Sequence, residues 1–281
     1  MQNLVGAAIV FVIIVFCYGI YTHSGKTTNT VSTPQIISIS NGLEIEGTKE
    51  ELVKEKGVIF TRINRTISSD ARIWDIILGA SSFFQIPPEI LLSTWYLESG
   101  MELGGDRGGA GGHFALAQLI KKQDEPEEAF RWHRFAMNEK SLKKICRHCG
   151  YSCDAIRGSS TGALGPMQFQ PDTWISGAVD ADGDGRVCPL DLPDAVYTAA
   201  MKLRNHAEYF SERYRNLNKG DKTVITLVKK GVITNKWDYG VLKYVGAFTP
   251  QTFQYLRRHQ SLRKIFDYYV KKYNEGHDLT S

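Results

Sequence analysis

One carboxylic acid stands where an apolar segment of the chain ends. Glu98 directly follows Trp95, Tyr96 and Leu97. Burial among such side chains disfavours the charged form of a carboxyl group and raises its pKa, so that the group stays protonated near neutral pH. A protonated carboxylic acid can donate its proton to a leaving oxygen, as acid-catalysed cleavage of a glycosidic bond requires. Glu98 is therefore the candidate catalytic residue.

A second segment with possible chemistry, residues 162–174, has the sequence Gly-Ala-Leu-Gly-Pro-Met-Gln-Phe-Gln-Pro-Asp-Thr-Trp. Gly165 permits a close approach between the backbone and a ligand. The amide of Gln168 both donates and accepts hydrogen bonds, which suits an acetamido or hydroxyl group. Pro171 is expected to begin a helix. The segment predicts a ligand-binding turn, with a tight loop between two helices as the alternative.

Residues 180–191 have the spacing of an EF-hand calcium loop. The oxygen ligands at positions 1, 3, 5, 7 and 12 of such a loop would come from Asp180, Asp182, Asp184, the carbonyl of Arg186, and Asp191. Gly185 provides the sharp turn at position 6. Asp191 is shorter than the usual glutamate, so we expect a modest affinity. The sequence predicts a structural calcium ion here, with a solvated acidic turn as the alternative.

These segments must be positioned by helices, because apolar residues around them recur at helical spacing. Residues 69–80 and 87–100 are predicted to form two helices, the second begun by proline and ended by glycine. Residues 194–209 and 262–273 are predicted to form two more. Neither a convincing set of alternating strands nor an internal repeat stands out in the sequence, so the predicted fold class is mainly α.

The N-terminus contains an apolar stretch long enough to cross a membrane. Residues 4–21 carry no charge and are rich in Val, Ile and Phe, and as a helix they would extend about 27 Å. A cleaved signal peptide is the alternative, but no Ala-x-Ala-like site follows the stretch. We therefore predict a single transmembrane anchor at residues 1–21, a flexible Ser/Thr/Asn-rich linker at 22–48 and one globular domain at 49–281.

Cysteine usage indicates the compartment of the domain. Four of the 5 cysteines lie outside the predicted anchor, namely Cys146, Cys149, Cys153 and Cys188. An even number of cysteines behind a membrane anchor favours disulfides in an oxidising space. We therefore expect a single-pass protein of the cell membrane whose domain is extracytoplasmic. The pairing stays open among three possibilities, and a zinc site that begins with Cys146 and Cys149 is the less favoured alternative.

The charge of the chain limits its partners. Lys and Arg number 34 and Asp and Glu 30, which gives a net charge of +4. Such a small excess suits an anionic wall polymer or lipid headgroups. Nucleic-acid binding needs a concentrated basic patch, which the sequence lacks. The stretch 257–272 is locally basic, which is typical of a solvated helix face.

Taken together, these segments resemble the lytic transglycosylases, especially their membrane-bound B type. That family has a helix ending in Glu-Ser, then a Gly-Ala-Met/Leu-Gly-x-x-Gln-Phe loop and a calcium loop, inside a lysozyme-like helical domain. Here the matching stretches are residues 87–100, 162–174 and 180–191, in the same order. The resemblance extends over roughly residues 69–203, about half of the chain. It implies a lysozyme-like transglycosylase domain behind the membrane anchor.

The resemblance implies a mechanism with one acid. Glu98 would protonate the oxygen that links N-acetylmuramic acid to N-acetylglucosamine in peptidoglycan. Its carboxylate would then deprotonate the C6 hydroxyl, which closes a 1,6-anhydro ring. Tyr244 would stand for the tyrosine of a late Tyr-Asn pair, although Val245 replaces the asparagine and leaves simple packing as the alternative. The substrate-binding residues carried over from the family are Ser99, Gly165, Met167, Gln168, Phe169 and Tyr244.

Three other functions stay open. A hydrolytic muramidase would use the same acid and activate water with a further carboxylate, for which Asp106 in the glycine-rich stretch 104–112 is the candidate. A non-catalytic peptidoglycan-binding scaffold of an envelope or secretion complex would not need Glu98. A calcium-regulated partner-binding protein would depend on the loop at 180–191. The expected partners are otherwise peptidoglycan strands and the membrane.

Overall fold

The computed structural model describes residues 36–39, 43–46, 57–59, 61–66, 72–103, 112–125, 132–214, 221–246 and 248–275. The predicted membrane anchor at residues 1–21 and the candidate base Asp106 lie outside these ranges. Among the described residues, no helix combines the length and the apolar character that a membrane span requires. The chain divides into two compact units, Met1–Lys49 and Glu50–Ser281, which are described separately.

The first unit contains an antiparallel hairpin. Strand β1, Ile36–Ile39, pairs with β2, Leu43–Glu46, so that Ile36 lies opposite Glu46. The isoleucines of both strands favour extended backbone. The hairpin falls within the predicted linker at residues 22–48, where the Ser/Thr/Asn-rich composition did not lead us to expect strands. The linker itself stays a prediction.

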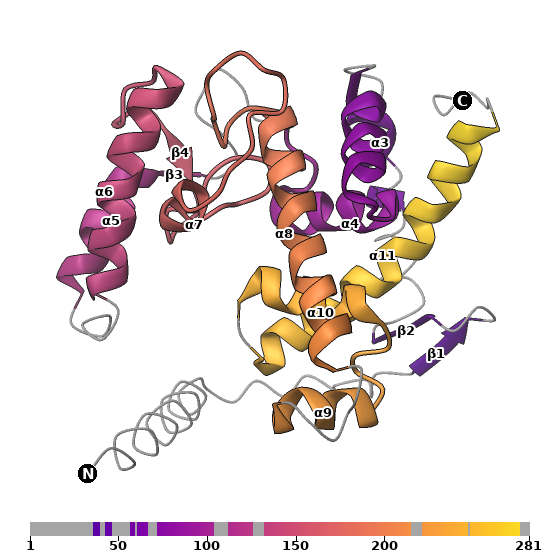
Figure 1. The fold of residues 1–281 in the computed structure, drawn as a ribbon. Helices are drawn as coiled ribbons and strands as arrows, with labels where there is room; N and C mark the ends of the chain where they lie inside the picture. Colours follow the sequence, from indigo (N-terminus) through magenta and orange to yellow (C-terminus); the bar gives the residue numbers. More distant parts are fainter. Residues whose placement is uncertain are drawn as a thin grey trace, which may run out of the picture. The chain divides into compact units, whose positions relative to one another are not determined.

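The second unit is built mainly from helices, which confirms the predicted mainly α class (Figure 1). Its elements in chain order are α3 Arg72–Phe84, α4 Pro88–Ser99, β3 His113–Phe114, α5 Ala115–Asp124, α6 Trp132–Cys149, β4 Arg157–Gly158, α7 Pro171–Ile175, α8 Leu192–Arg213, α9 Lys222–Lys229, α10 Lys236–Val245 and α11 Pro250–Asn274. The two short strands pair antiparallel, with His113 opposite Gly158. Helix α8 packs against α3 and α10, α11 packs against α4, and α5 packs against α6.

Helix α4 ends one residue after Glu98 and is surrounded by the core. Pro88 occupies its first turn, where the missing N–H has no intrahelical partner to lose. Its buried apolar side chains are Ile90, Leu91, Leu92 and Trp95. Gly100 ends the helix in the left-handed conformation, with φ of 67°, and a side chain there would collide with the guanidinium of Arg62. The helix therefore stops where the sequence predicted, with Glu98 in its last turn.

The last helix is longer than the sequence pattern predicted. It was expected over residues 262–273, whereas α11 begins at Pro250. The side chain of Thr249 accepts the backbone N–H of Thr252, and the side chain of Thr252 accepts the N–H of Thr249, which forms a capping box. The first half of α11 is rich in Gln, Arg and His. A search for apolar spacing therefore missed it.

Two disulfides pair the four cysteines of the second unit. Cys146 is bonded to Cys153, and Cys149 is bonded to Cys188. The prediction of disulfides is thereby confirmed, and these four sulfurs are not available to a zinc ion. The second bond joins α6 to the acidic loop before α8 across 39 residues of sequence. It restricts the unfolded chain and holds that loop against α6.

Candidate active site

Two adjoining cavities meet at Glu98. One has a volume of about 440 Å³ and the other of about 450 Å³. Glu98, Ser159 and Gln168 line both cavities, so the acid is reached from either side. We call the two cavities together the groove. A linear polymer that lies through the groove would pass over the carboxyl group.

The carboxyl group of Glu98 is half-buried and faces α11. Burial raises its pKa to about 7, while a hydrogen bond from Tyr255 opposes the rise. The hydroxyl of Tyr255 donates to Oε1 of Glu98 over 2.6 Å. Burial and the neighbouring Glu98 raise the pKa of Tyr255 well above its usual value, so this hydroxyl stays a neutral donor. Near neutral pH, Glu98 therefore exists in both protonation states.

A buried polar network holds α11, and with it Tyr255, against α4. Arg263 donates to Asp238 of α10 over 2.7 Å and to Nδ1 of His259 over 2.8 Å. Burial and the charge of Arg263 lower the pKa of His259 well below its usual value, so the ring is neutral. Because Nδ1 accepts a bond, the ring proton is on Nε2, which donates to Thr94 of α4 over 3.0 Å. These hydrogen bonds join α4, α10 and α11, and His259 lies one helical turn after Tyr255 on α11.

Backbone hydrogen bonds close the predicted ligand-binding turn at residues 164–169. Leu164 and Phe169 exchange backbone hydrogen bonds of 2.8 and 2.9 Å, and Gln168 has a positive φ of 50°. A residue other than glycine in this conformation is strained, and it persists only where the surrounding structure holds it. The side-chain amide of Gln168 donates to the carbonyl of Gly165 over 2.8 Å. This bond holds Gln168 in place at the surface of the groove, beside Glu98.

The other residues predicted in this turn have different positions. Gly165 and Met167 are buried. A side chain at Gly165 would collide with the carbonyl of Pro189, so its close approach is to the chain itself rather than to a ligand. The carbonyl of Met167 accepts the hydroxyl of Tyr244 over 2.8 Å. Tyr244 and Phe169 line the second cavity, with their rings edge to face at 5.8 Å.

Ser99 lines the first cavity and stabilises the turn after α4. Its hydroxyl donates to the carbonyl of Trp95 over 3.4 Å and accepts the backbone N–H of Glu102 over 3.3 Å. Tyr255 was absent from the residues predicted for the site. No local motif marks it, because its contact with Glu98 joins positions 157 residues apart.

Basic side chains line the groove on both sides of the acid. They are Arg62 and Arg258 in the first cavity and Arg134, Lys202, His206 and Lys243 in the second. Burial lowers the pKa of Lys202 and of His206, and the charges of Lys243 and Lys202 lower that of His206 further. Among the described residues that line the groove, Glu102 is the only carboxylate besides Glu98. The groove therefore favours an anionic substrate.

The sequence matches the family model of the transglycosylase SLT domain over residues 60–214, which is more than half of the chain. The chain belongs to the transglycosylase SLT domain family. A comparison with curated proteins found no significant match.

Solved structures of lytic transglycosylases are similar to this chain. The Escherichia coli lytic transglycosylase Slt35 in complex with calcium has a TM-score of 0.52 at 16% identity, over 77% of this chain and 82% of that chain. Slt35 in complex with bulgecin A has a TM-score of 0.51 at 18% identity, over 73% of both chains. The soluble lytic transglycosylase SltB1 from Pseudomonas aeruginosa has a TM-score of 0.44 at 24% identity, over 53% of this chain. The match spans 47% of SltB1, about half of its length. The Slt35 matches show the mainly helical, lysozyme-like transglycosylase fold.

The acidic loop of this SLT domain brings three carboxylates together. Side-chain oxygens of Asp180, Asp182 and Asp194 lie within 4.8 Å of one another. Asp194 was not among the predicted ligands, and its oxygens accept the backbone N–H groups of Ala181 and Cys188, both over 2.8 Å. Burial raises the pKa of Asp194 to about 6, and nearby carboxylates add to the rise. An all-oxygen set with crowded negative charge fits a hard cation such as Ca²⁺.

The remaining predicted ligands are placed differently. Asp184 accepts the backbone N–H of Arg186 over 2.7 Å and pairs with its guanidinium over 3.0 Å. Asp191 is the N-cap residue of α8. Burial raises the pKa of Asp191, and the charges of Asp182 and Asp184 raise it further. Asp191 thus lies near the cluster without forming part of it.

Proposed function

We propose that this protein is a lytic transglycosylase. It would cleave the β-1,4 bond between N-acetylmuramic acid and N-acetylglucosamine in peptidoglycan and leave 1,6-anhydromuramoyl ends. The observation that carries the proposal is one acid with a pKa of about 7 at the junction of two cavities. Membership of the transglycosylase SLT domain family supports the same reaction, as does the shared fold with Slt35, a lytic transglycosylase.

In the proposed reaction, Glu98 first donates and then accepts a proton. Because Tyr255 donates to Oε1, the neutral acid carries its proton on Oε2, from which it passes to the glycosidic oxygen as the bond to C1 breaks. The carboxylate then accepts the proton of the C6 hydroxyl while O6 bonds to C1 and closes the ring. Glu98 ends protonated, as it began. A pKa of about 7 suits both steps, because proton transfer is most efficient when the pKa lies near the working pH.

We further propose that the carboxylates of Asp180, Asp182 and Asp194 hold a structural calcium ion, whose charge would offset their repulsion. The structure of Slt35 in complex with calcium supports this proposal. The same loop contains Pro189, whose carbonyl packs on Gly165 in the turn that carries Gln168. A braced loop would therefore keep that turn in place.

We also propose that the protein is anchored in the cell membrane. A single-pass anchor at residues 1–21 would place the domain on the outer side of the cell membrane, within reach of peptidoglycan. The two disulfides support an oxidising compartment. An envelope or secretion complex is proposed as the partner that recruits the protein.

Digestion of purified peptidoglycan tests the proposed reaction. The wild-type protein should release muropeptides with 1,6-anhydromuramoyl ends, identified by mass spectrometry. Glu98→Gln preserves the size of the side chain and removes the acidic proton, so we expect the rate to fall about 10²–10⁴-fold. Glu102→Gln is the matched control and should retain activity, because Glu102 is exposed.

Other products would identify the alternatives. Reducing ends in place of anhydro ends would indicate a hydrolytic muramidase, and their loss in Glu102→Gln would name the second carboxylate. If wild type and Glu98→Gln both bind peptidoglycan and neither releases products, the protein is a non-catalytic scaffold.

A further inference from the structure

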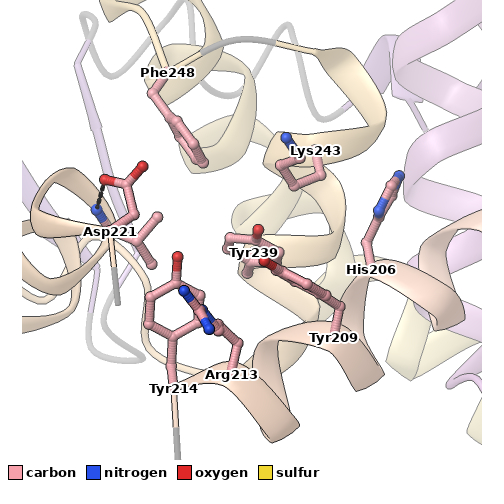
Figure 2. Close-up of a pocket in the computed structure, with 9 residues that line it drawn as sticks. His206, Tyr209, Arg213, Tyr214, Asp221, Tyr239, Lys243 and Phe248 are labelled. Carbon is pink, nitrogen blue, oxygen red and sulfur yellow. Dashed lines mark hydrogen bonds between the residues drawn. The ribbon is translucent and has the colours of Figure 1, made fainter. Parts of the chain in front are cut away.

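A third cavity is lined by residues of α8, α9 and α10 (Figure 2). Its volume is about 600 Å³, larger than either cavity at Glu98. Aromatic and basic side chains surround it, and we call it the aromatic pocket. The proton transfers proposed for Glu98 do not use these side chains, so the pocket has no role in that reaction step.

The aromatic side chains form a continuous wall. The ring of Tyr239 lies 6.3 Å from that of Tyr209, 5.8 Å from that of Tyr214 and 6.3 Å from that of Phe248. Tyr239 is 4% exposed, whereas Tyr209 is 51% exposed. Rings held by their neighbours bind a ligand at little cost in side-chain entropy. The wall therefore offers a preformed surface to aliphatic groups and peptide planes.

Three basic side chains line the same pocket, namely His206, Arg213 and Lys243 (Figure 2). In the part of the chain that the structure describes, no carboxylate forms an ion pair with any of them. Asp221 is the pocket's one described acid, and as the N-cap of α9 it accepts the backbone N–H of Thr223 over 2.7 Å. Burial and the charges of Lys243 and Lys202 lower the pKa of His206, so the positive charge of the pocket comes from Arg213 and Lys243. These two charges exceed the single charge of Asp221, which favours an anionic group.

The aromatic pocket adjoins the groove. His206 and Lys243 line both the pocket and the cavity that contains Glu98 and Gln168. A side branch of a substrate that lies in the groove would therefore reach the pocket past these two side chains.

We infer that the aromatic pocket binds the peptide stem that muramic acid carries, through the carboxylates of that stem. The inference rests on the proposed function, because it assumes that a peptidoglycan strand lies in the groove. A stem peptide joins free carboxylates to methyl groups and peptide planes, which matches the basic side chains and the tyrosine wall of the pocket. A further neutral sugar would leave the charges of Arg213 and Lys243 without a counter-charge.

The test compares glycan strands that carry peptide stems with the same strands after an amidase has removed the stems. We expect the wild type to have a kcat/KM about tenfold higher on the peptide-bearing strands, the value of one charge-assisted contact. The double variant Arg213→Ala with Tyr209→Ala should lower this ratio toward one. Both side chains are exposed, so the fold should persist, and thermal unfolding checks that it does. Arg213→Gln alone should lower the ratio in part.

Lys229→Ala with Tyr268→Ala is the matched control, because it removes a basic group and a tyrosine that are exposed and lie outside the pocket. Its ratio should equal that of the wild type. An unchanged ratio in the pocket variant would overturn the inference. An equal loss on both substrates would also overturn it, since the pocket would then bind the glycan itself.

A binding measurement separates this inference from the proposed reaction. Glu98→Gln protein is titrated in a calorimeter with a soluble muramyl peptide and with the same compound after amidation of its carboxylates. We expect the free carboxylates to bind about tenfold more tightly, with the difference lost in the pocket variant and reduced at high salt. Equal affinity for both compounds would refute the inference. Tight binding without cleavage by the wild type would refute only the proposed function.

Discussion

Replacing Tyr255 by phenylalanine tests how the hydrogen bond from Tyr255 affects the pKa of Glu98. The change Tyr255→Phe removes the hydroxyl that donates to Oε1 of Glu98 over 2.6 Å and leaves the ring in place. That hydrogen bond lowers the pKa of Glu98, against the rise that burial causes. Because a carboxylate holds such a donor more strongly than a neutral acid does, the pKa of Glu98 should rise when the donor is lost.

The size of the rise follows from the energy of the bond. A hydrogen bond to a charged group contributes about 1.5–3 kcal/mol, and one pKa unit corresponds to about 1.4 kcal/mol. The neutral acid retains part of the bond, since its carbonyl oxygen also accepts. We therefore expect the pKa to rise from about 7 by roughly one unit. Cleavage begins with the protonated acid, so activity is lost above this pKa, and the alkaline limb of the pH–rate profile should move to higher pH.

The assay is the initial rate of anhydromuropeptide release from weakly acidic to alkaline pH, for wild type and Tyr255→Phe. The matched control is Tyr244→Phe, because that hydroxyl donates to the carbonyl of Met167 rather than to Glu98. Its alkaline limb should stay close to that of the wild type, even where its rate is lower. A limb in Tyr255→Phe that stays in place, or moves to lower pH, would refute this account of Glu98.

Three further changes have defined outcomes. Glu98→Gln should stabilise the folded protein at alkaline pH, as urea unfolding at several pH values would show. The cost of ionising the half-buried Glu98 in the folded state is absent below pH 4.5, grows as the pH rises and reaches about 3 kcal/mol above pH 7. Gly165→Ala should lower the free energy of unfolding by at least about 2 kcal/mol, because φ is 70° and the new side chain meets the carbonyl of Pro189; an unchanged urea midpoint would contradict this. Calcium should raise the Tm of the wild type but not that of Asp194→Asn, and equal increases in both would place the ion elsewhere.

The sequence alone determined those parts of the site that depend on one segment of the chain. Proline at its start and glycine at its end set the length of α4 and place Glu98 in its last turn. Proline and glycine act through their own backbone preferences, so such boundaries can be predicted locally. The number of cysteines predicted disulfides in the same way. It could not predict the pairing, which depends on where α6 meets the loop before α8.

Only the tertiary structure decided which distant groups meet. Tyr255 reaches Glu98 because the buried network around Arg263 and His259 holds α11 against α4. Asp194 joins the acidic cluster from the first turn of α8, outside the linear spacing of a calcium loop. Motif spacing describes neighbours along the chain, whereas burial and hydrogen bonding across helices depend on packing. The sequence therefore predicted Glu98 as the candidate acid, whereas the packing of the helices sets the pKa of its carboxyl group.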